Sequence, residues 1–97
     1  VIAYHTQGEV IYWKFLDYEV PRAAEIANEF ARVSGYVAEE TPYGSGFAGY
    51  KDWFIQTYLK PGYTIEAGLG ENPLPLSQLP DIYRDNEGIL TLGMALS

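Results

Sequence analysis

Residues 21–35 constrain the fold of this chain most, because they have the pattern of an amphipathic helix whose two ends are both marked. Pro21 stands at the start, where a proline loses no hydrogen bond, and Gly35 stands at the end, where glycine often stops a helix. The apolar residues recur at helical spacing on one face: Ala23, Ile26, Ala27, Phe30 and Ala31. A helix with one apolar face needs a second layer to cover it, which the rest of the chain must supply.

Two strand-like runs, residues 1–4 and 63–66, lie on either side of this helix in the sequence. Residues 10–15 are strongly aromatic and β-prone, and they fit either a strand or a connection packed on the core. The order strand, helix, helix, strand, helix predicts an α/β fold, with the second helix at residues 51–58. Two strands are too few for a stable sheet, so we expect further strands from a segment outside this chain or from a second copy.

The last helix is expected to begin at Pro80, in its first turn. Its apolar residues predict a buried stripe made of Leu79, Ile82, Tyr83, Leu90 and Met94. The acidic residues of this helix lie at helical spacing and not at the spacing of a calcium-binding loop, so they predict a solvated face.

Composition excludes several classes of function. The chain has 97 residues and a net charge of −7, which disfavours nucleic acid and anionic membrane surfaces as partners. It has no cysteine, so disulfides, iron–sulfur clusters and thiol catalysis are excluded within it. No apolar run approaches the ~18 residues that a membrane-spanning helix requires. One domain at most is expected over residues 1–97.

Two ionisable residues stand at the ends of the strand-like runs. His5, the only histidine, follows the first run, and Glu66 ends the second, just before glycines. Single histidines in small domains are most often surface or hydrogen-bonded core residues, and Glu66 could equally be a carboxylate in water at a strand end. One histidine cannot close a zinc site alone, so any metal chemistry here would be only part of a site.

Four groups of residues, in this order, resemble the C-terminal part of zinc carboxypeptidases of the funnelin type. They are His5-Thr6-Gln7-Gly8-Glu9, Tyr50-Lys51-Asp52-Trp53, Thr64-Ile65-Glu66 and Asn72-Pro73. The resemblance covers nearly the whole chain and is closest to the bacterial branch that cleaves γ-D-glutamyl–diamino acid bonds in peptidoglycan peptides. It implies that residues 1–97 are the C-terminal segment of a catalytic domain, with part of a mixed sheet and its flanking helices.

The resemblance also implies roles for four residues. His5 matches the second histidine ligand of the zinc, and Glu66 matches the carboxylate that activates the zinc-bound water. Tyr43, in the loop of residues 39–49, is similar in place to the tyrosine that closes over the substrate. Lys51 falls where the family sets side-chain preference, and a cation there favours a substrate with an extra carboxylate, as in diaminopimelate or glutamate. Without the resemblance, Tyr43 reads as a loop aromatic and Lys51 as a solvated helix residue.

The family's first zinc motif, a histidine and a glutamate close together, has no counterpart here, nor have its substrate-binding arginines and asparagine. We therefore expect the 97-residue chain to be inactive alone and to bind Zn2+ weakly or not at all. The longer protein would act on a peptide, such as a peptidoglycan stem peptide. A bacterial enzyme of this kind could be secreted, associated with the cell wall or active during sporulation.

Two other functions stay open at the level of sequence. The chain could be a non-catalytic module that binds the cell wall or another protein through its tyrosine-rich loop. It could also self-associate, because strand edges and apolar faces left uncovered tend to pair with another copy, which predicts a homo-oligomer.

Overall fold

The computed structural model describes residues 1–42 and 49–96 and confirms the α/β prediction. A mixed four-stranded sheet has the order β1-β4-β2-β3. Its strands are β1 (Ile2–His5), β2 (Val10–Tyr12), β3 (Val37–Glu39) and β4 (Tyr63–Glu66). β1 runs parallel to β4, β4 antiparallel to β2, and β2 parallel to β3. The expectation of two strands is therefore wrong: β2 and β3 complete a four-stranded sheet within the chain.

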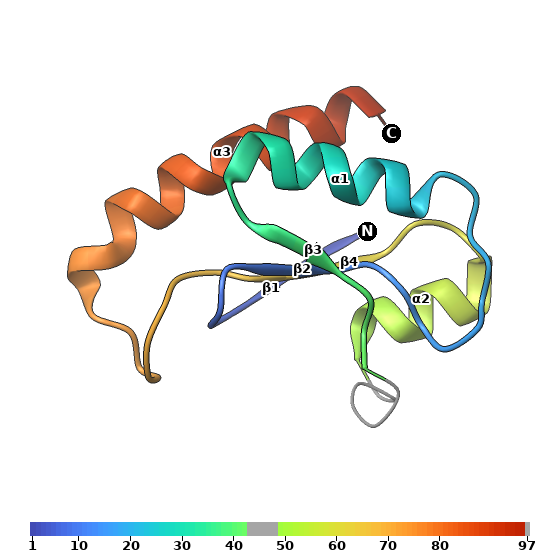
Figure 1. The fold of residues 1–97 in the computed structure, drawn as a ribbon, viewed down its shortest axis with the longest axis horizontal. Coiled ribbons are helices and arrows are strands. Elements are labelled where there is room, and N and C mark those ends of the chain that lie inside the picture. The colour runs from blue at the N-terminus through green and yellow to red at the C-terminus, as the bar shows by residue number, and fades with distance from the viewer. Residues whose placement is uncertain (43–48, 97) are drawn as a thin grey trace.

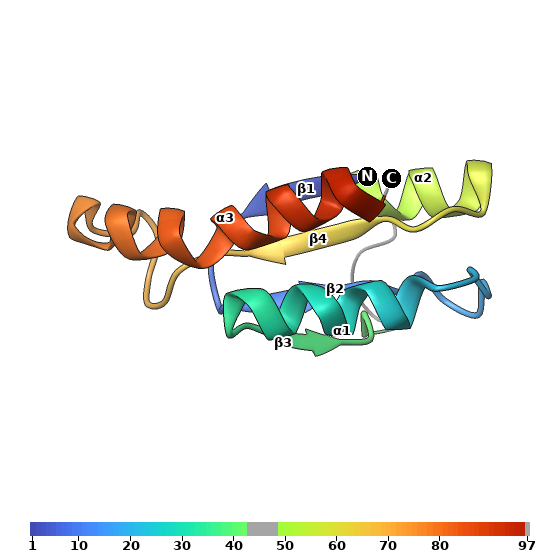
Figure 2. The same cartoon turned by 90° about the horizontal axis from the view of Figure 1, so that it is seen from above.

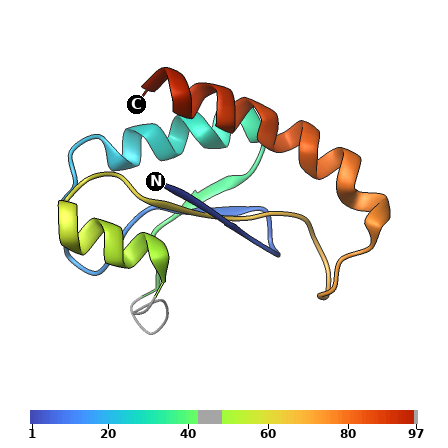
Figure 3. The ribbon, with the colours of Figure 1, turned by 180° about the vertical axis from the view of Figure 1, so that it is seen from behind.

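Helices flank the sheet on both sides, as Figures 1 and 3 show. The helices α1 (Ala23–Ser34) and α3 (Leu79–Leu96) lie together over one face, and α2 (Tyr50–Tyr58) lies toward the other. A 3-10 turn, Leu76–Gln78, leads into α3. Seen from above, α3 lies over the β1 and β4 side of the sheet and α1 over the β2 and β3 side (Figure 2). Among these helices none is long and apolar enough to cross a membrane.

Helix α1 follows the sequence prediction closely. Ala23, Ala27 and Phe30 are buried on its inner face, and Gly35 ends it with a φ of 78°. The helix begins two residues after Pro21, because Arg22 adopts a left-handed conformation with a φ of 67° and cannot continue a right-handed helix. Together with Ile89 of α3, the buried residues Ala27 and Phe30 form a core between the two helices α1 and α3 and the sheet.

Helix α3 departs from its predicted buried stripe. Four of the five residues expected inside are exposed, by fractions of 49% to 75%: Leu79, Tyr83, Leu90 and Met94. The buried residues are Asn86 and Ile89. Gly88 explains this orientation, because a Cβ there would lie only 3.1 Å from Cβ of Val33, so α1 and α3 approach closely at this point.

Alternation along the strands separates the two faces of the sheet. Tyr63 and Ile65 of β4 are buried toward α1 and α3, together with Ile11 of β2. Tyr63 packs edge-on against Phe30, with ring centroids 5.1 Å apart. Successive residues of a strand point to opposite faces, so the residues between these apolar ones face the side of α2.

Candidate functional site

The register of the parallel pair places His5 beside Glu66. The two residues are direct partners at the ends of β1 and β4. Neighbouring strands of a sheet lie about 4.8 Å apart, so the backbones of the two residues are close. Partners in one register share a face of the sheet, and both side chains line a pocket of about 280 Å³. His5 is exposed and Glu66 is half-buried, so the two are open to a ligand. The structure thus brings together two residues that are distant in sequence.

The same alternation that buries Tyr63 and Ile65 directs the other residues of β4 into this pocket. Thr64 and Glu66 both line it, and Tyr12 of β2, the register partner of Thr64, lies beside them. Sequence reasoning missed Thr64 and Tyr12 as pocket residues. Thr64 could have been predicted from its position two residues before Glu66, because residues two apart in a strand lie on the same face of the sheet.

Backbone and side-chain hydrogen bonds join the segments that follow β1 and β4. The Ala67 amide donates to the carbonyl of His5 at 2.8 Å, and the Gly8 amide donates to the carbonyl of Gly68 at 2.7 Å. Further out, the Thr6 hydroxyl donates to Oδ1 of Asn72 at 2.6 Å. These bonds hold the two strand ends together, so the relative position of His5 and Glu66 is set by the fold.

Lys51 lies in the wall of the pocket, but its charge is not free. Its ammonium forms a buried ion pair with the carboxylate of Asp52 and donates to the carbonyl of Lys14 at 2.9 Å. Both side chains of the pair are only 3% exposed. Asp52 also accepts a hydrogen bond from the Gly49 amide at 3.3 Å, at the start of α2. The pair therefore fastens α2 to the end of β2, and the role of Lys51 in substrate binding stays a prediction.

Tyr43 lies outside the described residues, so its predicted role is not tested. Across residues 1–42 and 49–96, no group of three or more histidine, cysteine, aspartate or glutamate residues could hold a metal ion. A catalytic zinc takes three protein ligands, so the donors in this part of the chain do not close a zinc site.

Next to the pocket, α2 presents a cluster of exposed aromatic rings. Tyr50 stacks on Trp53 with centroids 5.8 Å apart, and Tyr58 meets Trp53 edge-on, also at 5.8 Å. All three are more than half exposed. An aromatic surface beside a polar pocket can pack against apolar faces of a ligand while keeping polar groups in water.

Comparison with known proteins identifies two relatives of this chain. No family model matches the chain. It is 49% identical over 96 residues to gamma-D-glutamyl-L-diamino acid endopeptidase 1 of Lysinibacillus sphaericus, and 43% identical over 90 residues to the uncharacterized protein YqgT of Bacillus subtilis strain 168. These matches cover 99% and 93% of the chain but 24% of each relative. The chain thus spans about a quarter of the length of the curated relatives it matches, and over nearly all its own length it is homologous to the endopeptidase.

Proposed function

We propose that this chain is the C-terminal part of a zinc metallopeptidase of the funnelin type. The whole protein would hydrolyse peptide or γ-D-glutamyl–diamino acid bonds, with peptidoglycan peptides as substrates. One observation carries the proposal: His5 and Glu66 are register partners in one pocket, in a chain that is 49% identical to an endopeptidase named for such bonds.

Glu66 is the proposed general base and acid. Its carboxylate lies half-buried at a strand end, where it can take a proton from an attacking water and return it to the leaving amine. Zinc, when bound in the whole protein, would polarise the scissile carbonyl and lower the pKa of a water molecule. His5 would supply one ligand, and the remaining ligands would come from outside this chain.

The pocket beside these residues is the proposed site for the substrate side chain. Thr64 and Tyr12, which each carry a hydroxyl group, line its wall together with the Lys51–Asp52 pair. Lys51 would favour a substrate with an extra carboxylate, as diaminopimelate has. Because Asp52 already neutralises much of that charge, we expect the preference for an acidic side chain to be modest.

Metal binding and catalysis test the proposal in the full-length protein. We expect His5→Ala to lose zinc, and Glu66→Gln to retain zinc but lower kcat by about a hundredfold or more. Glu29→Gln, an exposed carboxylate of α1 paired with Arg32, is the matched control and should leave both unchanged. Full activity of Glu66→Gln would remove Glu66 from the reaction.

Calorimetry on the isolated 97-residue chain gives a second test. We expect weak zinc binding or none, because the described donors do not form a three-ligand group. Tight binding of one zinc per monomer would contradict a site completed from elsewhere.

The exposed aromatic cluster favours a second candidate function, a non-catalytic module that binds the cell wall or a protein. In that case Trp53→Ala would abolish binding to purified peptidoglycan, while Glu66→Gln would not change it. For the peptidase, the reverse is expected: Glu66→Gln removes turnover, and Trp53→Ala leaves hydrolysis measurable.

A further inference from the structure

Tyr36 places a hydroxyl group in the apolar core of this chain. It stands between α1 and β3, and only 4% of its surface is exposed. The Tyr36 amide donates to the Ser34 hydroxyl at 3.1 Å, and this hydroxyl donates to the Phe30 carbonyl at 2.8 Å, which fixes the backbone of Tyr36 at the end of α1. A buried hydroxyl needs hydrogen-bond partners, so the partners of Tyr36 indicate what this residue holds in place.

The Tyr36 hydroxyl accepts hydrogen bonds from two other segments. Nδ2 of Asn86, in α3, donates to it at 3.0 Å, and the same nitrogen donates to the Ile82 carbonyl at 2.9 Å. Asn86 is 6% exposed, so this part of the network is enclosed. The backbone amide of Gly68 is the second donor to the hydroxyl. Tyr36 therefore connects α3 to the peptide of Gly68.

This peptide lies directly behind the candidate site, because Gly68 is two residues after Glu66. Its carbonyl accepts from the Gly8 amide at 2.7 Å, and the Ala67 amide donates to the His5 carbonyl at 2.8 Å. Residues 67–68 are thus bound to the segment that follows β1 through these two bonds, and to the core through the tyrosine hydroxyl.

The packing around Gly68 leaves its peptide little room to shift. Gly68 has a φ of 80°, and a Cβ at this position would clash with Leu74 and lie 3.0 Å from Cδ1 of Ile82. The backbone therefore approaches these side chains more closely than any residue with a Cβ could. Loss of the Tyr36 hydroxyl would remove one of the hydrogen bonds that hold this close approach.

We propose that Tyr36 is a positioning residue for Glu66. Its hydroxyl fixes the Gly68 peptide from the core side, and this holds the end of β4 where Glu66 is the register partner of His5. The hydroxyl is enclosed in the core, so it acts through the backbone and not on the substrate. The inference rests on the proposed function, because it takes Glu66 as the group that moves the proton. Displacement of such a group by even 1 Å is costly to catalysis.

Kinetics of Tyr36→Phe in the full-length protein test this role. The substitution removes the hydroxyl and keeps the ring, so the core stays filled. We expect kcat to fall at least about tenfold, with KM within about twofold and the zinc content unchanged, because the proton-transfer step depends on the position of Glu66.

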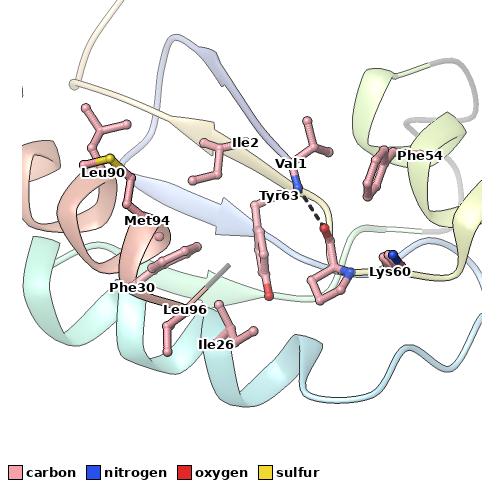
Figure 4. Close-up of a pocket in the computed structure, with 12 residues that line it drawn as sticks. Val1, Ile2, Ile26, Phe30, Phe54, Lys60, Tyr63, Leu90, Met94 and Leu96 are labelled. Carbon is pink, nitrogen blue, oxygen red and sulfur yellow. Dashed lines mark hydrogen bonds between the residues drawn. The ribbon is translucent and has the colours of Figure 1, made fainter.

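Tyr63→Phe is the matched control, because it also removes one buried hydroxyl. That hydroxyl donates to the Ala23 carbonyl at 3.0 Å, so it binds α1 and not the strand ends. Figure 4 shows Tyr63 beside an apolar hollow with Ile26 and Phe30, on the face of the sheet away from the pocket. Its kcat should stay within about twofold of the unsubstituted protein. An equal loss of kcat in both variants would overturn the inference, since the loss would then follow from a weakened core.

A double variant shows whether Tyr36 acts through Glu66. In the Glu66→Gln background the carboxylate that Tyr36 positions is gone, so Tyr36→Phe should leave the residual kcat unchanged. A fall by the same factor in both backgrounds would overturn the inference. It would mean that the hydroxyl affects the site by another route.

Hydrogen exchange gives a readout that does not depend on activity. Under native conditions, peptides that contain residues 67–68 should exchange at least about tenfold faster in Tyr36→Phe than in Tyr63→Phe. Unchanged protection of this segment would overturn the inference.

The same variants separate this inference from the proposed function. Loss of turnover in Glu66→Gln together with full kcat in Tyr36→Phe would refute the positioning role alone. Full activity of Glu66→Gln would refute both the proposed role of Glu66 and the positioning role of Tyr36.

Discussion

The buried Lys51–Asp52 pair gives the sharpest prediction about stability. Lys51→Met removes the ammonium and leaves the Asp52 carboxylate in a site that is 3% exposed, where the Gly49 amide is its remaining partner among the described residues. Breaking a buried pair by removing one partner costs about 3–5 kcal/mol, chiefly because an uncompensated charge stays buried. We therefore expect Lys51→Met to lower the free energy of unfolding by about that amount.

A double variant tests the cause of this loss. Lys51→Met with Asp52→Asn removes both charges, and the asparagine oxygen can still accept from the Gly49 amide, so the double variant should be more stable than Lys51→Met alone. Arg84→Met is the matched control: it breaks the exposed pair with Asp81, whose side chains are 71% and 67% exposed, and should cost less than about 1 kcal/mol.

Urea unfolding followed by tryptophan fluorescence measures all three variants, since Trp53 lies next to the pair in α2. The reasoning is refuted if Lys51→Met costs no more than Arg84→Met. It is also refuted if the double variant is less stable than Lys51→Met, because the loss would then come from packing and not from the stranded charge.

Two further predictions concern β4 and the turn after it. Tyr63→Phe removes the hydrogen bond from the hydroxyl to the Ala23 carbonyl, 3.0 Å long, and should cost about 1 kcal/mol at neutral pH by urea unfolding. Burial raises the pKa of Tyr63, so the stability that its neutral form contributes is fully present below the unfolded pKa of about 10 and is lost as the pH rises further. In Tyr63→Phe the free energy of unfolding should therefore decline less steeply above pH ~10 than in the unsubstituted protein. An unchanged slope would contradict this. Gly68→Ala should lower the melting temperature more than Gly70→Ala. Both glycines have a positive φ, but an added Cβ would clash with Leu74 only at position 68. Equal melting temperatures of the two variants would contradict this.

The parts of the structure that sequence could predict are those set by local periodicity. Phe30 and Ala27 recur at helical spacing, and their burial in α1 follows from that spacing alone. The end of β4 was also predictable, because Ile65 and Glu66 mark the switch from a buried to an open position. The position of His5 beside Glu66 could not be predicted in the same way, because it depends on the pairing of β1 with β4, and no local sequence pattern indicates which strands pair.

The Lys51–Asp52 pair shows what sequence could not predict. Adjacent residues on a helix do not normally face each other, so nothing in the sequence indicates that these two side chains meet. Their meeting depends on the Lys14 carbonyl, 37 residues away, which draws the ammonium inward. The strand β3 was missed, and residues 10–15 were left open between a strand and a connection, for a similar reason. Three residues carry too weak a pattern, and the stability of β2 and β3 comes from pairing with β4 and with each other.

The error over α3 carries the most information about the molecule. The prediction assumed that all apolar residues of the helix meet one core, but the helix has two apolar faces. Ile89 faces α1, whereas Tyr83, Leu90 and Met94 face the open edge of β1. A helix that is apolar on two sides fits between two packed neighbours. The described residues supply one such neighbour, α1, and the second apolar face stays exposed among them, which is why four of the five residues of the predicted stripe are not buried.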